Sequence, residues 1–219
     1  MPEHIVERKP RPRDRVVIRL SGGRFFAIPE EAAAALAVGT ELSNADIDRL
    51  DGVDQSLRGR DKAMRMLAIR ARSRREIDHA LRALGLLDAV RMGLLTELEE
   101  SGLVDDERFA REFVSVKKDV RRLGPHRLRS DLKKLGVNRD VVDGALRTFS
   151  PDQQEAMARA LADRQVGWGE VSEKIVRRIM GMLARKGYDF AVVNRVGYDL
   201  ARRVKRDDRS DDPLPDARD

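Results

Sequence analysis

Three glycines recur at a fixed interval of 51 residues, and this spacing constrains the fold more than any other feature of the chain. They are Gly85, Gly136 and Gly187. The same offset aligns three apolar columns, which are Ile77, Leu128 and Ile179, then Leu81, Leu132 and Leu183, then Val90, Val141 and Val192. Such a fixed register predicts an internal repeat.

We interpret each repeat as a unit of three helices. Apolar residues recur in it at intervals of three and four, which places them on one side of a helix. The glycine follows the second helix, where a left-handed backbone is easily adopted only by Gly or Asn. Three short helices bury little apolar surface alone, so the units are expected to stack on one another.

The predicted fold is therefore mainly α, with tandem three-helix repeats in an elongated array. A small N-terminal region at 15–59 is expected to hold a β-hairpin, from two β-branched and aromatic runs around a glycine pair, and short helices. Residues 1–14 and 204–219 are rich in charge and proline, and we expect both to be disordered. The repeats are expected at 60–104, 105–150 and 151–203.

Residues that favour helix starts predict further elements in the N-terminal region. Pro29 is expected to start a helix over 30–37. Ser43 is expected to cap a second short helix that ends near Leu50. Residues 51–59 are interpreted as a linker to the first repeat.

Composition excludes several classes of function. The chain has no cysteine, so thiolate catalysis, disulfides and thiolate metal sites are excluded. The three histidines are scattered without metal-ligand spacing, and no nucleophile is paired with a base, so we expect neither a metal, a cofactor nor an enzyme. Asp105 and Asp106 precede a helical segment, where capping explains them better than acid–base catalysis. The charged, proline-broken N-terminus and the lack of a long apolar run favour a cytoplasmic protein.

Positive charge is concentrated in two segments, each at the junction of the first and second helix of a repeat. One runs from Lys117 to Lys134 and holds eight basic residues against two acidic ones. The other runs from Arg60 to Arg82 and holds eight against three. If the repeats stack in register, the two segments form one basic strip that suits a polyanion or an acidic protein surface. The alternative is that these side chains only solvate helix faces and cover the core.

Three segments of the repeats read as motifs. Residues 102–114 read GLVDDERFAREFV, residues 124–137 read GPHRLRSDLKKLGV, and residues 183–188 in the third repeat read LARKGY. These segments resemble the first motif, the second motif and a further pattern of the RecX family, the regulatory partners of the RecA recombinase. The second segment departs from the family in having Leu135 where a lysine commonly precedes the glycine. The likeness spans about 61–200.

The resemblance implies a helical modulator that binds the RecA–DNA filament and inhibits its recombinase, ATPase and coprotease activities by blocking extension or promoting disassembly. It also implies a place in homologous recombination, DNA repair and the SOS response. The alternative hypothesis is a helical protein that binds single- or double-stranded DNA directly, without RecA. In either case we expect a monomer. The candidate contact residues are Arg70, Arg72, Arg74, Arg75, Arg108, Arg111, Lys117, Lys118, Arg121, Arg122, Arg127, Arg129, Lys133 and Lys134.

Overall fold

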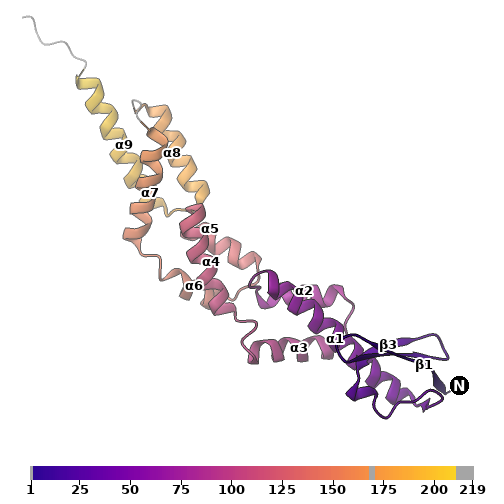
Figure 1. The fold of residues 1–219 in the computed structure, drawn as a ribbon. Helices are drawn as coiled ribbons and strands as arrows, with labels where there is room; N and C mark the ends of the chain where they lie inside the picture. The colour runs from indigo at the N-terminus through magenta and orange to yellow at the C-terminus, as the bar shows by residue number, and fades with distance from the viewer. Residues whose placement is uncertain (1, 168–170, 211–219) are drawn as a thin grey trace, which may run out of the picture. The chain divides into compact units, whose positions relative to one another are not determined.

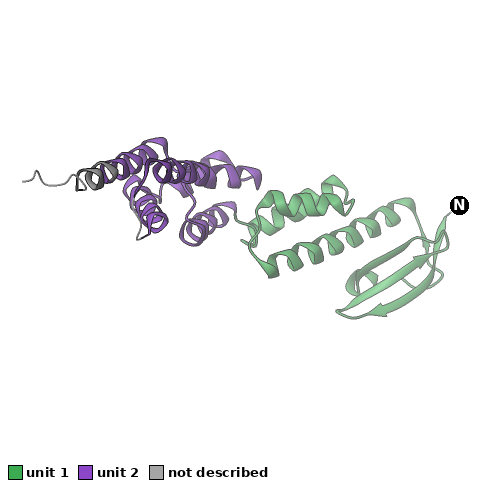
Figure 2. Ribbon diagram, turned by 90° about the horizontal axis from the view of Figure 1, so that it is seen from above, with its two compact units in different colours: residues 1–105 green, residues 106–219 purple. Residues whose placement is uncertain are grey.

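The computed structural model describes residues 2–167 and 171–210, with side chains up to residue 203. The chain divides into two compact units, residues 1–105 and 106–219 (Figure 2). The first unit holds a β-sheet and a helical triplet, and the second holds two further triplets. Within the described residues, no helix combines the length and the apolar character needed to cross a membrane.

A four-stranded antiparallel sheet opens the first unit. Its strands are β1 (Glu3–Arg11), β2 (Arg15–Leu20), β3 (Phe25–Pro29) and β4 (Glu41–Leu42), in the spatial order β3-β2-β1-β4. Alternate residues face one side of a strand. The buried side chains of the sheet pack against the first helix, and this cluster includes Ile5, Val16, Ile18, Phe26, Ile28, Ile47 and Leu50.

The expectation that 1–14 form a disordered arm is wrong. Residues Ile5 to Arg11 pair with β2, from Ile5 opposite Leu20 to Arg11 opposite Arg15. The cations of β1 lie on exposed positions and its two glutamates are half-buried, while its one fully buried side chain, Ile5, anchors the strand. β4 pairs with β1 only at Glu3 and His4, so at Pro10 the other edge of β1 carries no strand from the part of the chain that the structure describes. Proline is tolerated at such an edge and does not break the pairing with β2.

The expected pair of short helices is also corrected. Residues 30–37 form only a 3₁₀ turn, η1 (Glu31–Ala33), and the linker expected at 51–59 lies inside one long helix, α1 (Asn44–Ile69). The cap at Ser43 is confirmed, because its hydroxyl accepts from the Asp46 amide and the Asp46 carboxylate accepts from the Ser43 amide. The supposed linker is polar because Asp54 and Gln55 are buried and bind backbone amides of Ala27 and Leu87.

Three helical triplets follow in chain order (Figure 1). The first is α1, α2 (Arg74–Ala83) and α3 (Asp88–Glu100). The second is α4 (Asp106–Arg121), α5 (Pro125–Lys134) and α6 (Arg139–Leu146). The third is α7 (Pro151–Val166), α8 (Glu173–Lys186) and α9 (Phe190–Ser210). The predicted mainly helical fold of tandem triplets is confirmed.

The glycine register has the predicted cause. Gly85, Gly136 and Gly187 follow α2, α5 and α8 with φ of +73°, +79° and +85°. After α5 and α8 the two hydrogen bonds of a Schellman motif are present, for example from the amide of Tyr188 to the carbonyl of Leu183. The two apolar columns on the second helices are fully or almost fully buried in all three triplets.

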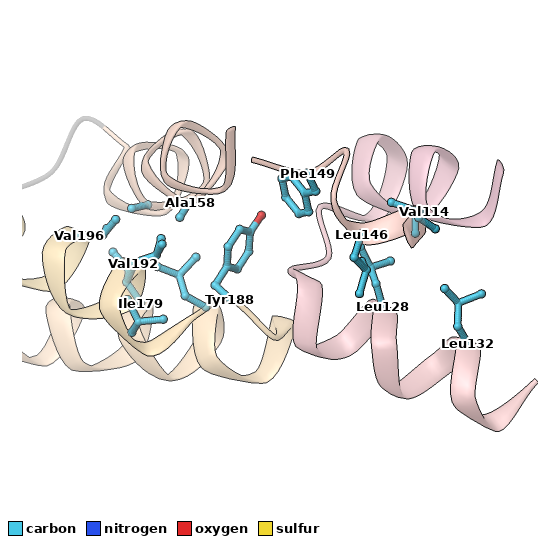
Figure 3. Close-up of a cluster of buried hydrophobic side chains, with 14 of the residues drawn as sticks. Val114, Leu128, Leu132, Leu146, Phe149, Ala158, Ile179, Tyr188, Val192 and Val196 are labelled. Atoms are coloured by element: carbon cyan, nitrogen blue, oxygen red, sulfur yellow. The ribbon is translucent and has the colours of Figure 1, made fainter. Parts of the chain in front are cut away.

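The second and third triplets share one apolar core within the second unit. Figure 3 shows Leu128, Leu132 and Leu146 on one side and Ile179, Val192 and Val196 on the other, with Phe149 and Tyr188 between them. Stacking of these two triplets on each other is therefore observed.

Three apolar side chains that fit the helical periodicity are nevertheless exposed. Leu87, Val116 and Phe190 keep 58%, 56% and 79% of their surface in solvent. Each belongs to an apolar series, but each lies at the margin of its helix stripe, which periodicity alone does not resolve. The disordered tail expected over 204–219 is wrong over 204–210, because α9 continues to Ser210. Residues 211–219 and Trp168 lie outside the described residues.

Candidate partner-binding groove

The turn between α4 and α5 is held against the turn between α8 and α9. The amide of Gly124 donates to the carbonyl of Lys186 at 2.9 Å, and the amide of His126 donates to the carbonyl of Gly187 at 3.0 Å. The Lys186 ammonium donates to the carbonyl of Arg121 at 2.8 Å. These hydrogen bonds fix the basic segment from Lys117 to Lys134 to the third triplet.

Tyr188 closes this junction from the side of the core. Its hydroxyl donates to the carbonyl of Arg122 at 3.2 Å. Arg122 has φ of +53°, a conformation that a non-glycine residue adopts only when its surroundings hold it there. Burial raises the pKa of the Tyr188 phenol to about 12, so the hydroxyl remains a donor at physiological pH.

Beside the junction lies a hollow of about 560 Å³, which we call the basic groove. Its walls come from α4, α5 and the end of α8, and its lining contains six cationic side chains and one carboxylate. Apolar side chains of Phe113, Leu123, Leu135 and Met182 line the rest. The charged lining residues are Lys117, Arg121, Arg127, Asp131, Lys134, Arg185 and Lys186.

Most of this positive charge is not neutralised. Asp131 lies 3.2 Å from Arg127 and neutralises the charge of that guanidinium. Lys117 sits over the ring of Phe113, 5.5 Å from its centroid. Among the described residues, no carboxylate lies within 4 Å of Arg121, Lys134 or Arg185, which are all exposed. A groove with several unpaired cations on an apolar floor can hold an anionic surface.

The structure therefore divides the segment from Lys117 to Lys134 between two faces. Four of its candidates, Lys117, Arg121, Arg127 and Lys134, line the basic groove. Arg129 and Lys133 instead line a separate hollow of about 470 Å³ with Arg139 and Asp143, and Arg129 is paired with Asp143 at 2.9 Å.

The remaining candidates of the second triplet lie outside both hollows. Lys118 sits over the ring of Phe149 at 5.5 Å from its centroid. Arg122 serves the junction through its backbone carbonyl. Arg108 and Arg111, on the first turns of α4, form ion pairs one turn away with Glu112 and Glu107. Exposed pairs of this kind contribute little to stability and are typical of a solvated helix face.

The candidates of the first triplet are largely neutralised by their own unit. Arg70 and Arg72 both bind Glu76, at 2.6 and 3.1 Å, and Arg74 binds Glu99 at 2.7 Å. Burial of Glu76 raises its pKa, but the hydrogen bonds from the two arginines and the Ser73 amide outweigh this and leave the pKa below its usual value. Of the four candidates in this triplet, Arg75 alone has no carboxylate within 4 Å among the described residues. The shared strip along both segments stays a prediction.

Two groove residues, Arg185 and Lys186, were missed by the choice of candidates. The repeat register contains the signal that finds one of them, because Arg185 stands 51 residues after Lys134. Lys134 and Arg185 each lie in the last turn of the second helix of their triplet. The equivalent position of two stacked triplets therefore contributes a cation to the basic groove.

Comparison with known proteins gives consistent matches. A family model described as the second three-helix domain of RecX matches residues 105–146, which is the second triplet. The regulatory protein RecX of Thermobifida fusca is 37% identical over 145 residues, which is 65% of this chain and 78% of that protein. The regulatory protein RecX of Mycolicibacterium smegmatis is 34% identical over 150 residues, or 65% and 80%.

Two solved structures share the fold. A crystal structure of a regulatory protein RecX superposes with a TM-score of 0.67 at 22% identity, over 89% of this chain and 98% of that one. The crystal structure of RecX from Lactobacillus salivarius superposes with a TM-score of 0.61 at 19% identity, over 68% and 97%. At these identities the structures support the fold alone.

Proposed function

We propose, from the premise that this chain belongs to the RecX family of regulatory proteins, that it binds RecA–DNA filaments and inhibits their recombinase, ATPase and coprotease activities. The protein blocks filament extension or promotes disassembly, acts in the cytoplasm as a monomer, and acts by binding without catalysis.

The basic groove is the observation that carries this proposal. A filament of protein on DNA offers acidic protein surface and phosphates, and both are attracted by the unpaired cations of Arg121, Lys134 and Arg185. The apolar floor around Phe113 and Met182 adds area that gains free energy only when a partner covers it. Charge then governs the rate of encounter, and the floor governs how long the contact lasts.

The basic groove is also preorganised for binding by the way the two triplets pack. Its two walls come from different triplets and are joined by backbone hydrogen bonds at Gly124 and Gly187. The cations are therefore held at fixed separations before a partner arrives, which lowers the entropic cost of binding.

A pull-down tests the proposal. RecA is assembled on immobilised single-stranded DNA, with and without nucleotide, and the full chain is added as wild type or with Arg121→Glu and Lys134→Glu. We expect retention of the wild type on the filament and loss of retention of the variant. Retention of both proteins to the same extent would remove the groove from the proposal.

The alternative function makes a different prediction for the same beads. A helical protein that binds DNA directly is retained on DNA without RecA, and its retention falls steeply as salt rises. Retention that rises when RecA is present, and whose RecA-dependent part is lost with Arg121→Glu and Lys134→Glu, favours the filament as the partner.

A further inference from the structure

A second basic surface lies in the first unit, at the tip of the hairpin formed by β1 and β2. Every residue from 8 to 14 is exposed. This segment reads RKPRPRD and contains four cations, two prolines and one carboxylate. The surface is built entirely within the first unit and shares no residue with the basic groove.

The tip differs from the rest of its sheet in how its charges are matched. Four arginines of the sheet have carboxylate partners, and only Arg8 among them belongs to residues 8–14; the pairs are Arg8–Glu30, Arg15–Asp61, Arg19–Glu7 and Arg24–Glu3. Lys9, Arg11 and Arg13 have no carboxylate within 4 Å among the described residues. The uncompensated charge is therefore confined to the tip.

Helix α1 adds a further cation to this surface. Arg15 binds both carboxylate oxygens of Asp61, at 2.6 and 2.7 Å. The Arg15 hydrogen bonds hold the pKa of Asp61 below its usual value, and the nearby charges of Arg65 and Arg13 lower it further. Arg65 is exposed and lies one helical turn after Asp61, so the two side chains share a face of α1. Because Arg15 already neutralises Asp61, Arg13 and Arg65 contribute excess positive charge.

The backbone of the tip is constrained in several ways. Arg13 and Asp14 have φ of +65° and +52°, the left-handed pair that fits a tight turn between antiparallel strands. Proline fixes φ at Pro10 and Pro12. The amide of Glu30 donates to the carbonyl of Asp14 at 2.8 Å, which ties the turn to the segment after β3. β3 pairs with β2 as far as Arg15, opposite Pro29, so the exposed turn stands at the end of the sheet. Antiparallel strands that present cations are one of the shapes with which proteins contact DNA.

We propose that the β1–β2 tip, through Lys9, Arg11 and Arg13 and together with Arg65 of α1, binds the phosphate backbone of DNA. Contacts from lysine and arginine to phosphates displace condensed counterions. Such contacts carry no sequence information, so the tip is expected to bind DNA without sequence preference. This contact does not depend on the basic groove or on RecA.

The competing explanation is that lysine and proline on β1 only protect an exposed strand edge from aggregation. Binding of DNA distinguishes the two. The full-length chain, without RecA, is titrated into fluorescein-labelled single-stranded and duplex oligonucleotides over a series of salt concentrations, and anisotropy gives the affinity. The test variant is Lys9→Gln/Arg11→Gln/Arg13→Asn, where asparagine suits the left-handed turn position.

A matched control changes the same net charge in the same unit. It is Arg19→Gln/Arg24→Gln/Arg49→Gln, three exposed arginines that already have carboxylate partners. We expect the tip variant to lower the slope of log affinity against log salt by about 2 to 3, and the control to leave it unchanged. Circular dichroism checks that both variants keep the wild-type helix and strand content.

Three outcomes overturn the proposal. The first is equal DNA affinity and salt slope for the tip variant and the wild type, which leaves the edge-protection explanation. The second is no DNA binding by the wild type. The third is a tip-dependent binding to vesicles of anionic lipid without any tip-dependent binding to DNA. None of these outcomes concerns inhibition of RecA, so they do not decide the proposed function.

Discussion

Gly124 and Gly187 meet backbone to backbone across the second unit. A Cβ atom on Gly124 would lie 2.4 Å from the carbonyl carbon of Gly187, and a Cβ on Gly187 would lie 2.3 Å from the amide nitrogen of Arg127. Contacts this short leave no room for any side chain. The junction therefore sets the distance between the walls of the basic groove, and glycine is required on both sides of it.

Replacement of Gly124 by alanine is expected to destabilise the second unit by about 2–3 kcal/mol, because the new methyl group meets rigid backbone. Urea unfolding measures the loss. Gly144→Ala is the matched control, since Gly144 lies inside α6 and a Cβ there meets only the flexible end of Arg147. The control is expected to be neutral or to stabilise by about 0.5–1 kcal/mol. Equal effects of the two substitutions would contradict the close approach.

Leu128→Ala is expected to cost about 3–4 kcal/mol, because Leu128 is fully buried in the core that the second and third triplets share. Inhibition of RecA should fall in parallel with the folded fraction, as measured by circular dichroism at several urea concentrations. Val120→Ala, at a position that is 75% exposed on α4, should change stability by less than about 0.5 kcal/mol. A Leu128→Ala protein that is fully folded but inactive would show that Leu128 has a direct role in binding.

Asp61→Asn is expected to lower stability by about 1 kcal/mol at neutral pH through loss of the paired hydrogen bonds to Arg15. The folded-state pKa of Asp61 is depressed, so its contribution is present above the unfolded value of about 4 and is lost as pH falls through the folded value. The wild type and the variant should therefore converge in stability in acid. Thermal unfolding from pH 7 to pH 2 measures this, and a constant difference across that range would refute the assignment.

Arg185→Glu is expected to weaken binding to RecA filaments about as much as Lys134→Glu, because the two residues share the groove and have no carboxylate within 4 Å among the described residues. Titration of the full chain onto filaments on labelled DNA gives both affinities. Arg139→Glu is the control, since Arg139 is 90% exposed on its side chain and lines the other hollow. A variant of Arg185 that binds like the control would restrict the site to the second triplet.

The sequence contained enough to predict the triplets and the ends of their second helices. Glycine at Gly85, Gly136 and Gly187 reports a left-handed backbone that few other residues adopt, and the buried leucines keep the helical period around it. These features depend on neighbouring residues in the chain, so they can be predicted without knowledge of what packs against the helix.

Other features depended on contacts between distant segments. β1 is a charged strand held by one buried residue, Ile5, and by pairing with β2, and neither is visible in its composition. Asp54 and Gln55 look like linker residues until their backbone partners at Ala27 and Leu87 are known.

The basic groove was only half predictable for the same reason. Lys117 and Lys134 stood out in a dense basic segment, whereas Arg185 comes from a segment about fifty residues later and joins them only through the junction at Gly187. Of the fourteen candidates named from sequence, the structure gathers four in one groove.

The most direct measurement is DNA-dependent ATP hydrolysis by RecA at substoichiometric amounts of the full chain. The wild type is compared with Lys117→Gln/Lys134→Gln, which removes two charges from the basic groove, and with Arg129→Gln/Lys133→Gln, which removes two from the other face of α5. We expect strong inhibition by the wild type and by the second variant, and weak inhibition by the first. An unchanged hydrolysis rate with the wild type, or equal inhibition by all three proteins, would contradict the account.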